Sequence, residues 1–459
     1  MDGRKESLHG GIGEVLRLSL PLVAAAILTT LNGLTDNFFL ARHSDVALRA
    51  ALPANTIVGF LTALVLVFLK YSGTLLAQAH GGGRRAHALA IAANAGWLIL
   101  FSVPLFLASL PLARTVLALF GHEPALLAQE CSLVRILLAG APFLALATVA
   151  AGFFTGQGLT RTVGVVTALG VTAKILLTPV LVFGCGPIPS LGIAGAGLSG
   201  VLSDILLCLA YAFAARRNPL VALAAHRPGL LSPKPGIIRR ILAAGFPLCG
   251  CIVIGHSGFF ALTALIGRLD APSAAASSAV FAINCPFNAI AIGLARGVEA
   301  LTGRFFGKGD LVAVRRTVFS SALVALVLSA AYIGLLLGCG RFLLGLFLSD
   351  DTPFDRAVYY AAGESVILML VLRIGIEFLM SILQSTLRGI GNTKAVFLAT
   401  MASTVLVWIP GLTLVTLFHP TVAAYWSLMI VSSLVLGAVN LRSLASSSAG
   451  QPPPAAAPR

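Results

Sequence analysis

The sequence predicts an all-α polytopic membrane protein, with twelve transmembrane helices in two pseudo-symmetric six-helix lobes. Of its 459 residues, 58% are hydrophobic and only 10% are charged, whereas a soluble domain carries about 25% charged residues. Apolar runs of about 18 residues or more, each long enough to cross a bilayer as a helix, recur along the whole chain. The alternating segments of about ten residues that are typical of a transmembrane β-barrel do not appear.

Glycines, prolines and clusters of charge separate the predicted spans. The spans cover residues 15–41, 47–77, 86–112, 126–153, 162–184, 191–215, 238–267, 273–303, 312–338, 356–385, 393–418 and 421–442. The predicted organisation is a cytoplasmic N-terminal segment 1–14, an N-lobe 15–215, a cytoplasmic linker 216–237, a C-lobe 238–442 and a disordered tail 443–459. No short apolar core with a cleavage site follows the basic N-terminus, so the first span is expected to be retained.

Lysines and arginines are distributed unequally between the two faces of the predicted protein. Of the 31, 20 fall on the face that carries both termini, six on the opposite face and five within the spans. Because cytoplasmic loops are enriched in Lys and Arg, we expect both termini in the cytoplasm and the chain in a bacterial inner membrane. The same rule accounts for the net charge of +15, so no nucleic-acid partner is expected.

The two halves of the chain are related by an internal repeat. At an offset of 226 residues the matched pairs are Pro21 and Pro247, Arg42 and Arg268, Lys70 and Arg296, Gly81 and Gly307, and Gly83 and Gly309. At an offset of 233, GQGLTR (156–161) matches GIGNTK (389–394), and seven inserted residues in the loop 348–356 would explain the change. Two parallel six-helix repeats around a central cavity suit transport by alternating access.

A single carboxylate interrupts the apolar stretch 18–42. Thr29, Asn32 and Asp36 fall within about 60° of one another on one face of the predicted helix. A charge inside a membrane span is costly and usually faces a protein interior or a water-filled pathway. We therefore interpret Asp36 as part of the switch of an ion-coupled transporter. The alternative is that Asp36 only pairs with a basic residue and holds two helices together.

The fifth span carries a lysine near its middle. Lys174 lies within about 40° of Thr167 and Thr178 on one helix face, and it requires a carboxylate partner. Asp36 is the strongest candidate, and Asp204 in the sixth span is the other. A cation beside Asp36 would repel sodium, which favours H+ over Na+ as the coupling ion. A static Asp36–Lys174 ion pair remains the alternative.

Two spans of the second half have polar faces that are too wide for contact with lipid alone, so they are expected to line a cavity or a seam. In the eighth span these residues are Asn284, Asn288, Arg296 and Glu299, and in the tenth they are Arg373, Glu377, Ser381 and Gln384. Pairing within each helix, between Arg296 and Glu299 and between Arg373 and Glu377, is the alternative. Glu364 falls on the opposite side of its helix and is expected at the outer rim.

The sequence offers little for catalysis or for cofactors. Its seven cysteines form no CxxC motif and no His/Cys cluster, so neither a zinc site nor a disulfide framework is indicated. No HExxH motif and no Ser/His/Asp set occur at a plausible depth. GQGLTR and GIGNTK follow no strand, so we interpret them as tight cytoplasmic turns with glycines in left-handed conformations. We expect no enzyme activity, no cofactor and no bound metal.

Several motifs together resemble the multidrug and toxic compound extrusion (MATE) family over residues 18 to about 441. They are LSLPL (18–22), Asp36 followed by FFLAR, LLAQAHGGG (75–83), GQGLTR, PSLGIAGAGLSG (189–200) and LRGIGNTKA (387–395). The stretch GVEALTGRFFGKGD (297–310) resembles the DinF-like branch. The resemblance implies a V-shaped pair of six-helix lobes that exports small organic compounds against an inward flow of protons or sodium.

The resemblance also exposes two departures from the family pattern. In DinF-like members the first-helix aspartate works with an asparagine and an aspartate of the fifth helix, in a pattern like NxxxDP, where this chain has Lys174 and Thr178 before Pro179. We therefore expect proton-coupled antiport by Asp36 paired with Lys174, in a monomer, with Asn32 and Thr178 as further ion-coupling residues. The alternative function is a flippase or exporter of a lipid-linked or anionic amphiphilic substrate, held by cavity residues such as Lys174, Arg296 and Arg373.

Overall fold

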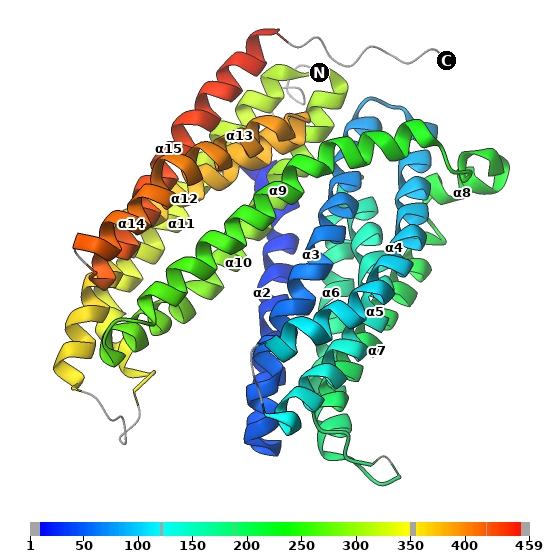
Figure 1. Ribbon diagram of the computed structural model, residues 1–459. Helices are drawn as coiled ribbons and strands as arrows, with labels where there is room; N and C mark the ends of the chain where they lie inside the picture. The colour runs from blue at the N-terminus through cyan, green and yellow to red at the C-terminus, as the bar shows by residue number, and fades with distance from the viewer. Residues whose placement is uncertain (1–9, 120–122, 188, 349–354, 419, 451–459) are drawn as a thin grey trace. The chain divides into compact units, whose positions relative to one another are not determined.

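A computed structural model describes residues 10–119, 123–187, 189–348, 355–418 and 420–450 (Figure 1). Its long helices are α2 (Ile12–His43), α3 (Asp45–Gly81), α4 (Arg85–Leu119), α5 (Pro124–Gly156), α6 (Thr160–Phe183), α7 (Ile193–Ala215), α9 (Pro235–Ile266), α10 (Ala271–Lys308), α11 (Leu311–Gly345), α12 (Arg356–Ile390), α13 (Thr393–Ser403) and α15 (Val422–Gly450). A π-helical turn, η2 (Thr404–Trp408), joins α13 to α14 (Ile409–Phe418). Twelve segments are long and apolar enough to span a membrane, and the described part of the chain contains no strand. The predicted all-α fold with twelve spans is confirmed.

The chain divides into two compact units. We call Leu20–Phe246 the N-terminal unit and the rest of the described chain the C-terminal unit. The boundaries lie beside Pro21 in α2 and Pro247 in α9, the two prolines that the offset of 226 relates. Each unit therefore contains six spans, except that the first turns of α2 and α9 group with the opposite unit.

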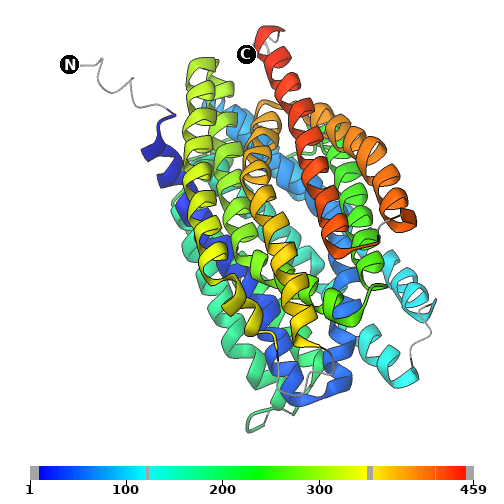
Figure 2. The same ribbon diagram turned by 90° about the vertical axis from the view of Figure 1, so that its left-hand side faces the viewer.

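Small side chains allow close helix packing inside the N-terminal unit. Ala50, Ala51 and Ala54 of α3 are fully buried in a cluster that includes Leu133 and Leu138 of α5, and α3 packs on α4 and α5. Packing of small residues replaces the hydrophobic driving force that membrane helices lack. In the C-terminal unit, α12 packs on α10, α11 and α15, and α13 runs beside α15 (Figure 2).

The internal repeat is visible in the backbone. Gly83 and Gly309, at an offset of 226, have φ of 73° and 79°, and Gly158 and Gly391, at an offset of 233, have φ of 81° and 95°. Each pair lies in the turn after equivalent helices, where only glycine enters this conformation without strain. The offset changes between the start of α11 and the start of α12. The loop predicted to hold the insertion lies there, and its residues 349–354 are outside the described chain.

The first glycine of each GxG turn has a different role from the one expected. Gly156 and Gly389 have no positive φ, and each lies in the last turn of a helix that crosses its neighbour closely. A Cβ on Gly156 would lie 2.9 Å from the carbonyl oxygen of Gly73, and one on Gly389 would lie 2.9 Å from that of Glu299. Only the second glycine of each turn uses the left-handed conformation, so the prediction was wrong for the first.

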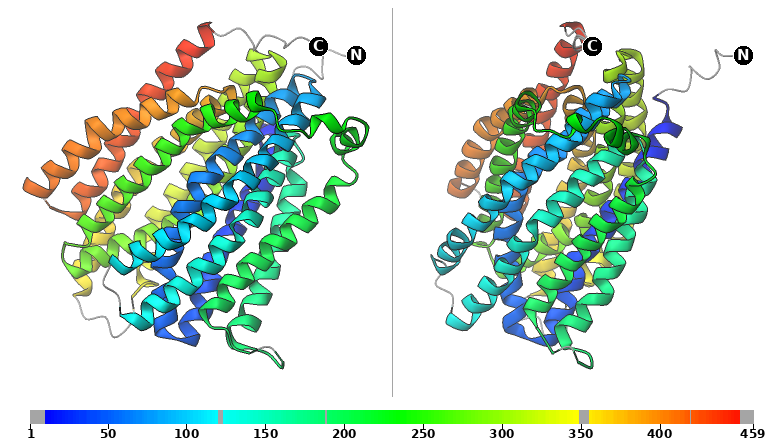
Figure 3. Two further views of the ribbon diagram at one scale, coloured as in Figure 1. Left: turned by 45° about the vertical axis from the view of Figure 1, so that its right-hand side comes forward. Right: turned by 90° about the vertical axis from the view of Figure 1, so that its right-hand side faces the viewer.

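The linker is structured and attached to α4. It contains the short helix α8 (Pro219–His226) and the 3-10 turn η1 (Pro228–Leu230), both packed on α4 (Figure 3). Buried Asn94 of α4 accepts a hydrogen bond from the backbone N–H of Lys234 at 2.6 Å, and Trp97 donates to the Leu231 carbonyl at 2.8 Å. The polar segment 216–237 is therefore held against the N-terminal unit.

Both ends of the chain differ in part from the expectation. The tail was expected to be disordered from residue 443, but α15 continues to Gly450. Residues 451–459 of the tail and residues 1–9 of the N-terminal segment lie outside the described chain. Helix α2 begins at Ile12, inside the segment expected to precede the first span.

Candidate functional site

An ion pair joins α2 and α6 inside the N-terminal unit. The Lys174 ammonium donates a hydrogen bond to Oδ2 of Asp36 at 2.8 Å, and the two side chains are only 11% and 16% exposed. Both residues lie about two turns or more from the nearer end of their helix. Asp36, rather than Asp204, is the ion-pair partner of Lys174 within the described chain, as the sequence favoured.

The second oxygen of the Asp36 carboxylate takes no part in the ion pair. Oδ1 is buried and has no hydrogen-bond partner among the described residues, and the same holds for Oδ1 of half-buried Asn32 one turn earlier. Thr29, the third residue of the predicted stripe, donates its hydroxyl to the carbonyl of Ala25 in its own helix. The stripe therefore presents two unpartnered acceptor oxygens, one of which can receive a proton.

Thr178 does not join Asp36 and faces α7 instead. Its hydroxyl bonds to the Lys174 carbonyl at 2.7 Å and to the Ser199 hydroxyl at 2.9 Å, and Thr178 is fully buried. Because Thr178 donates its one proton to the Lys174 carbonyl, the Ser199 hydroxyl is the donor to Thr178 and shares its proton with the carbonyl of Ala196. These bonds fix the position of α7 against α6 one turn from Lys174. Thr178 thus supports the backbone that carries the lysine, and its expected part in ion coupling stays a prediction.

The C-terminal unit has no counterpart of this ion pair at the positions that the repeat relates. The offset of 226 places Leu262, which is fully buried, at the position of Asp36, and the offset of 233 places Val407 at the position of Lys174. Val407 lies in the π-helical turn η2, a feature that often marks functional sites. The Asp36–Lys174 ion pair is therefore not repeated at these two related positions.

Polar residues of α10 and α12 form two ion pairs. Arg373 donates to Glu377 at 2.6 Å within α12, the arrangement given above as the alternative to a cavity role. Glu299 of α10 accepts a hydrogen bond from Arg388 of α12 at 3.1 Å. The sequence reading missed this second pair because it counted Arg388 only among the cytoplasmic cations. No pattern within one helix reveals it, since it depends on how the two helices cross.

The remaining predicted cavity residues have different exposures. Asn284 is buried, and its Oδ1 has no partner within the described chain. Gln384 is half-buried, and Asn288 and Arg296 are exposed. Their assignment to a substrate cavity stays a prediction. Glu364 lies 3.7 Å from Arg341, with both side chains more than half exposed, and its expected place at the outer rim stays a prediction.

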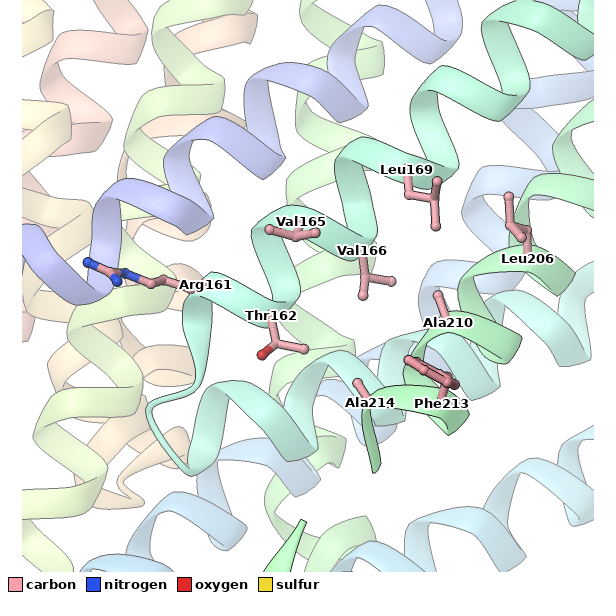
Figure 4. Close-up of a pocket in the computed structure, with 9 residues that line it drawn as sticks. All are labelled: Arg161, Thr162, Val165, Val166, Leu169, Leu206, Ala210, Phe213 and Ala214. Atoms are coloured by element: carbon pink, nitrogen blue, oxygen red, sulfur yellow. The ribbon is translucent and has the colours of Figure 1, made fainter. Parts of the chain in front are cut away.

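One cavity among the described residues lies elsewhere, between α6 and α7. It has a volume of about 550 Å³ and is lined by Arg161, Thr162, Val165, Val166, Leu169, Leu206, Ala210, Phe213 and Ala214 (Figure 4). Val165 and Phe213 are about 70% exposed, and the Arg161 side chain points away from the other labelled residues. This apolar groove contains none of the predicted site residues.

Comparison with known proteins identifies the family. The MatE family profile matches residues 21–180 and 247–413, one segment in each half of the chain. The probable multidrug resistance protein NorM of Pseudomonas putida is 27% identical over 421 residues, covering 91% of this chain and 90% of that protein. The multidrug export protein MepA of Staphylococcus aureus is 23% identical over 435 residues, covering 92% of this chain and 90% of that protein.

Solved structures share the fold. An outward-facing multidrug resistance MATE family transporter of the MOP superfamily has a TM-score of 0.84 at 18% identity, covering 97% of this chain and 98% of that chain. A MOP superfamily transporter from Pyrococcus furiosus Vc1, described as having a binding pocket of reverse polarity, has a TM-score of 0.81 at 18% identity, covering 96% and 97%. The curated relatives are named NorM and MepA, so the DinF-like branch stays a prediction.

The family match, the curated relatives and the helical architecture agree with one another. The profile covers more than half of the chain, the relatives are bacterial transport proteins rather than enzymes, and twelve segments can span a membrane. This chain therefore belongs to the MatE family and is a multi-pass transporter of the bacterial inner membrane.

Proposed function

We propose that this protein is a secondary active multidrug efflux transporter that works by alternating access and exchanges a small organic compound for protons. The names of the relatives support the substrate class, because NorM is described as a multidrug resistance protein and MepA as a multidrug export protein. The observation that carries the coupling proposal is the Asp36–Lys174 pair with the unpartnered Oδ1 of Asp36.

Protonation of Asp36 would change the electrostatics between two helices. In the ionised state, the carboxylate on α2 and the ammonium on α6 attract each other where water is scarce. A proton on Oδ1 removes one of the two charges, and breaking a buried pair in this way costs about 3–5 kcal/mol. Since about 1.4 kcal/mol shifts an equilibrium tenfold, this is enough to change which conformation is favoured.

The direction of coupling follows from the proton gradient. A proton taken up from outside would neutralise Asp36 and weaken its attachment to α6. Release of that proton to the cytoplasm would restore the ion pair. The Lys174 ammonium beside the carboxylate disfavours a sodium ion at the same place, because like charges repel. The proposal therefore has H+ as the coupling ion, with both termini cytoplasmic and a monomer as the working unit.

The alternative function is a flippase or exporter of a lipid-linked or anionic amphiphilic substrate. It needs cations that are free to hold a phosphate or carboxylate head group. Lys174 and Arg373 each already contact a carboxylate, at 2.8 Å and 2.6 Å. This pairing favours the antiporter over the alternative.

Dye accumulation in a pump-deficient bacterial host tests the proposal. The probes are ethidium, a cation, and fluorescein, an anion, measured with and without a protonophore and with and without sodium. We expect the wild-type chain to lower ethidium accumulation, the protonophore to abolish this effect, and Asp36→Asn to behave like the empty vector. Lys174→Asn should also behave like the empty vector when sodium is absent. Size-exclusion chromatography of each variant verifies that it is folded.

Three results would count against the proposal. Normal export by Asp36→Asn would show that the pair is scaffolding, and coupling would then be sought at Glu299 and Glu377. Export that depends on sodium and is insensitive to the protonophore would show that the coupling ion is sodium instead of H+. Competition by lipid-linked pyrophosphates, without any by ethidium, would favour the flippase.

A further inference from the structure

A second carboxylate lies close to the Lys174 ammonium. Asp204 occupies the middle of α7, and the structure fixes this stretch of α7 against α6. The Ser203 hydroxyl donates to the carbonyl of Gly170 at 2.8 Å on one side of Lys174, and Ser199 bonds to Thr178 at 2.9 Å on the other. Asp204 is therefore held in place by two hydrogen bonds between helices that flank the lysine.

The Lys174 side chain lies between Asp36 and this part of α7. A Cβ on Gly200 would be 4.0 Å from the Lys174 ammonium nitrogen, and Asp204 follows Gly200 by one helical turn on the same face. Lys174 is also the charged group that acts electrostatically on Asp204. The long, flexible lysine side chain can thus turn from the Asp36 carboxylate toward the Asp204 carboxylate.

The charges of these three residues do not balance. Two carboxylates share one ammonium, so the trio is one positive charge short when both are ionised. The described charged group that acts on Asp204 is Lys174 from α6. Asp204 in turn acts on the Cys208 thiol of its own helix, whose Sγ donates to the Phe143 carbonyl of α5. A net negative charge inside a membrane protein is unfavourable, so uptake of one proton by the trio is favoured.

We propose that Asp204 is the second partner of Lys174 in proton-coupled transport. It binds the Lys174 ammonium when Asp36 is protonated. This inference rests on the proposed antiport function. One proton binds Oδ1 of Asp36, the lysine keeps all its protons, and the ammonium moves from the α2 carboxylate to the α7 carboxylate. Protonation would thereby transfer an attachment of α6 from α2 to α7, instead of leaving a buried cation unpaired.

The test uses the full-length protein in proteoliposomes, with ethidium transport driven by a pH gradient. We expect Asp204→Asn to lower the transport rate by about tenfold or more, the factor that corresponds to about 1.4 kcal/mol, with ethidium binding changed less than about twofold. Asp204→Glu should restore part of the rate. Glu364→Gln, which removes an exposed carboxylate at the rim, is the control and should behave like the wild type.

A double variant tests whether Asp204 acts through Lys174. If it does, Asp204→Asn combined with Lys174→Gln should give the same infrared carboxyl band of protonated Asp36 at acidic pH as Lys174→Gln alone, because residues in one network are not additive. A weaker band in the double variant than in Lys174→Gln would overturn the inference. Wild-type transport by Asp204→Asn with no transport by Asp36→Asn would overturn it while leaving the proposed antiport in place. Normal transport by Asp36→Asn would overturn both.

If ethidium is not transported, a measurement without substrate tests whether Asp204 binds the Lys174 ammonium when Asp36 is protonated. Infrared difference spectra of the purified protein at acidic and alkaline pH show the carboxyl band of protonated Asp36, which Asp36→Asn identifies by removing it. In Asp204→Asn the ammonium has no other partner and stays with Asp36, so this band should be weaker at the same acidic pH. A band of unchanged strength in Asp204→Asn would contradict the inference.

Discussion

Glu299 of α10 accepts a hydrogen bond from Arg388 of α12 at 3.1 Å. The internal repeat relates this crossing of α10 and α12 to the crossing of α3 and α5 in the N-terminal unit, where glycines make the contact. The offset of 226 relates Glu299 to Gly73, whose carbonyl lies 2.9 Å from a Cβ built on Gly156. The related crossing between α10 and α12 thus has an ion pair in addition to the close approach at Gly389.

Arg388→Gln should destabilise the protein by about 1–3 kcal/mol, because it removes a charge-assisted hydrogen bond between side chains that are less than one quarter exposed. The measurement is the thermal unfolding of the purified protein in detergent. Arg341→Gln is the matched control, since Arg341 and Glu364 are exposed and 3.7 Å apart. Such a surface pair contributes about 0–1 kcal/mol. Equal losses for the two variants would contradict the prediction.

Gly156→Ala and Gly389→Ala should each lower stability, because the new methyl group would collide with a carbonyl oxygen of the neighbouring helix. Helices forced apart at such a crossing lose packing, and overpacking costs about 1–3 kcal/mol. The control is Gly96→Ala in α4, where a Cβ meets nothing within 4 Å. That change should be neutral or slightly stabilising, because alanine favours helix. The melting temperatures and yields of the three variants provide the comparison.

Asn94→Ala should release the linker from α4. The Asn94 side chain is fully buried and bonds to both the Ala90 carbonyl and the Lys234 N–H, and an unsatisfied buried group costs about 1–3 kcal/mol. Trypsin cleavage at Arg216, Arg217 or Arg227 measures the effect and should become faster. Trp97→Phe loses only the bond to the Leu231 carbonyl and should give a smaller increase. Cleavage at the wild-type rate in Asn94→Ala would show that the linker is held by other contacts.

The sequence was sufficient to predict the fold and one long-range contact, the Asp36–Lys174 ion pair. Apolar length and helical periodicity predict twelve spans, and both ends of the Asp36–Lys174 pair were predictable because a buried charge of each sign requires a partner. The contact could be predicted without the structure because few charged residues lie within the first six spans.

The details that depend on helix crossings could not be predicted in this way. Thr178 shares a helix face with Lys174, yet it contacts α7 while the lysine side chain reaches α2. Residues within an arc of about 40° on one helix can still contact two different neighbouring helices. The arc therefore does not predict which neighbour each side chain reaches. Gly156 and Gly158 are also indistinguishable in sequence, although one supports a crossing and the other a left-handed turn.

Lys174→Asn should allow sodium to drive transport. In the wild-type chain the ammonium occupies one oxygen of Asp36 at 2.8 Å and repels other cations. The substitution removes this charge and adds an amide oxygen beside the unpartnered oxygens of Asp36 and Asn32. Hard cations prefer such a set of oxygen ligands. Transport of ethidium into proteoliposomes, with sodium or potassium gradients at equal pH on both sides, measures the change. Lys174→Met removes the cation without adding an oxygen and should respond less to sodium. Sodium-driven transport by the wild-type chain, or equal responses of Lys174→Asn and Lys174→Met, would show that the ammonium does not determine ion selectivity.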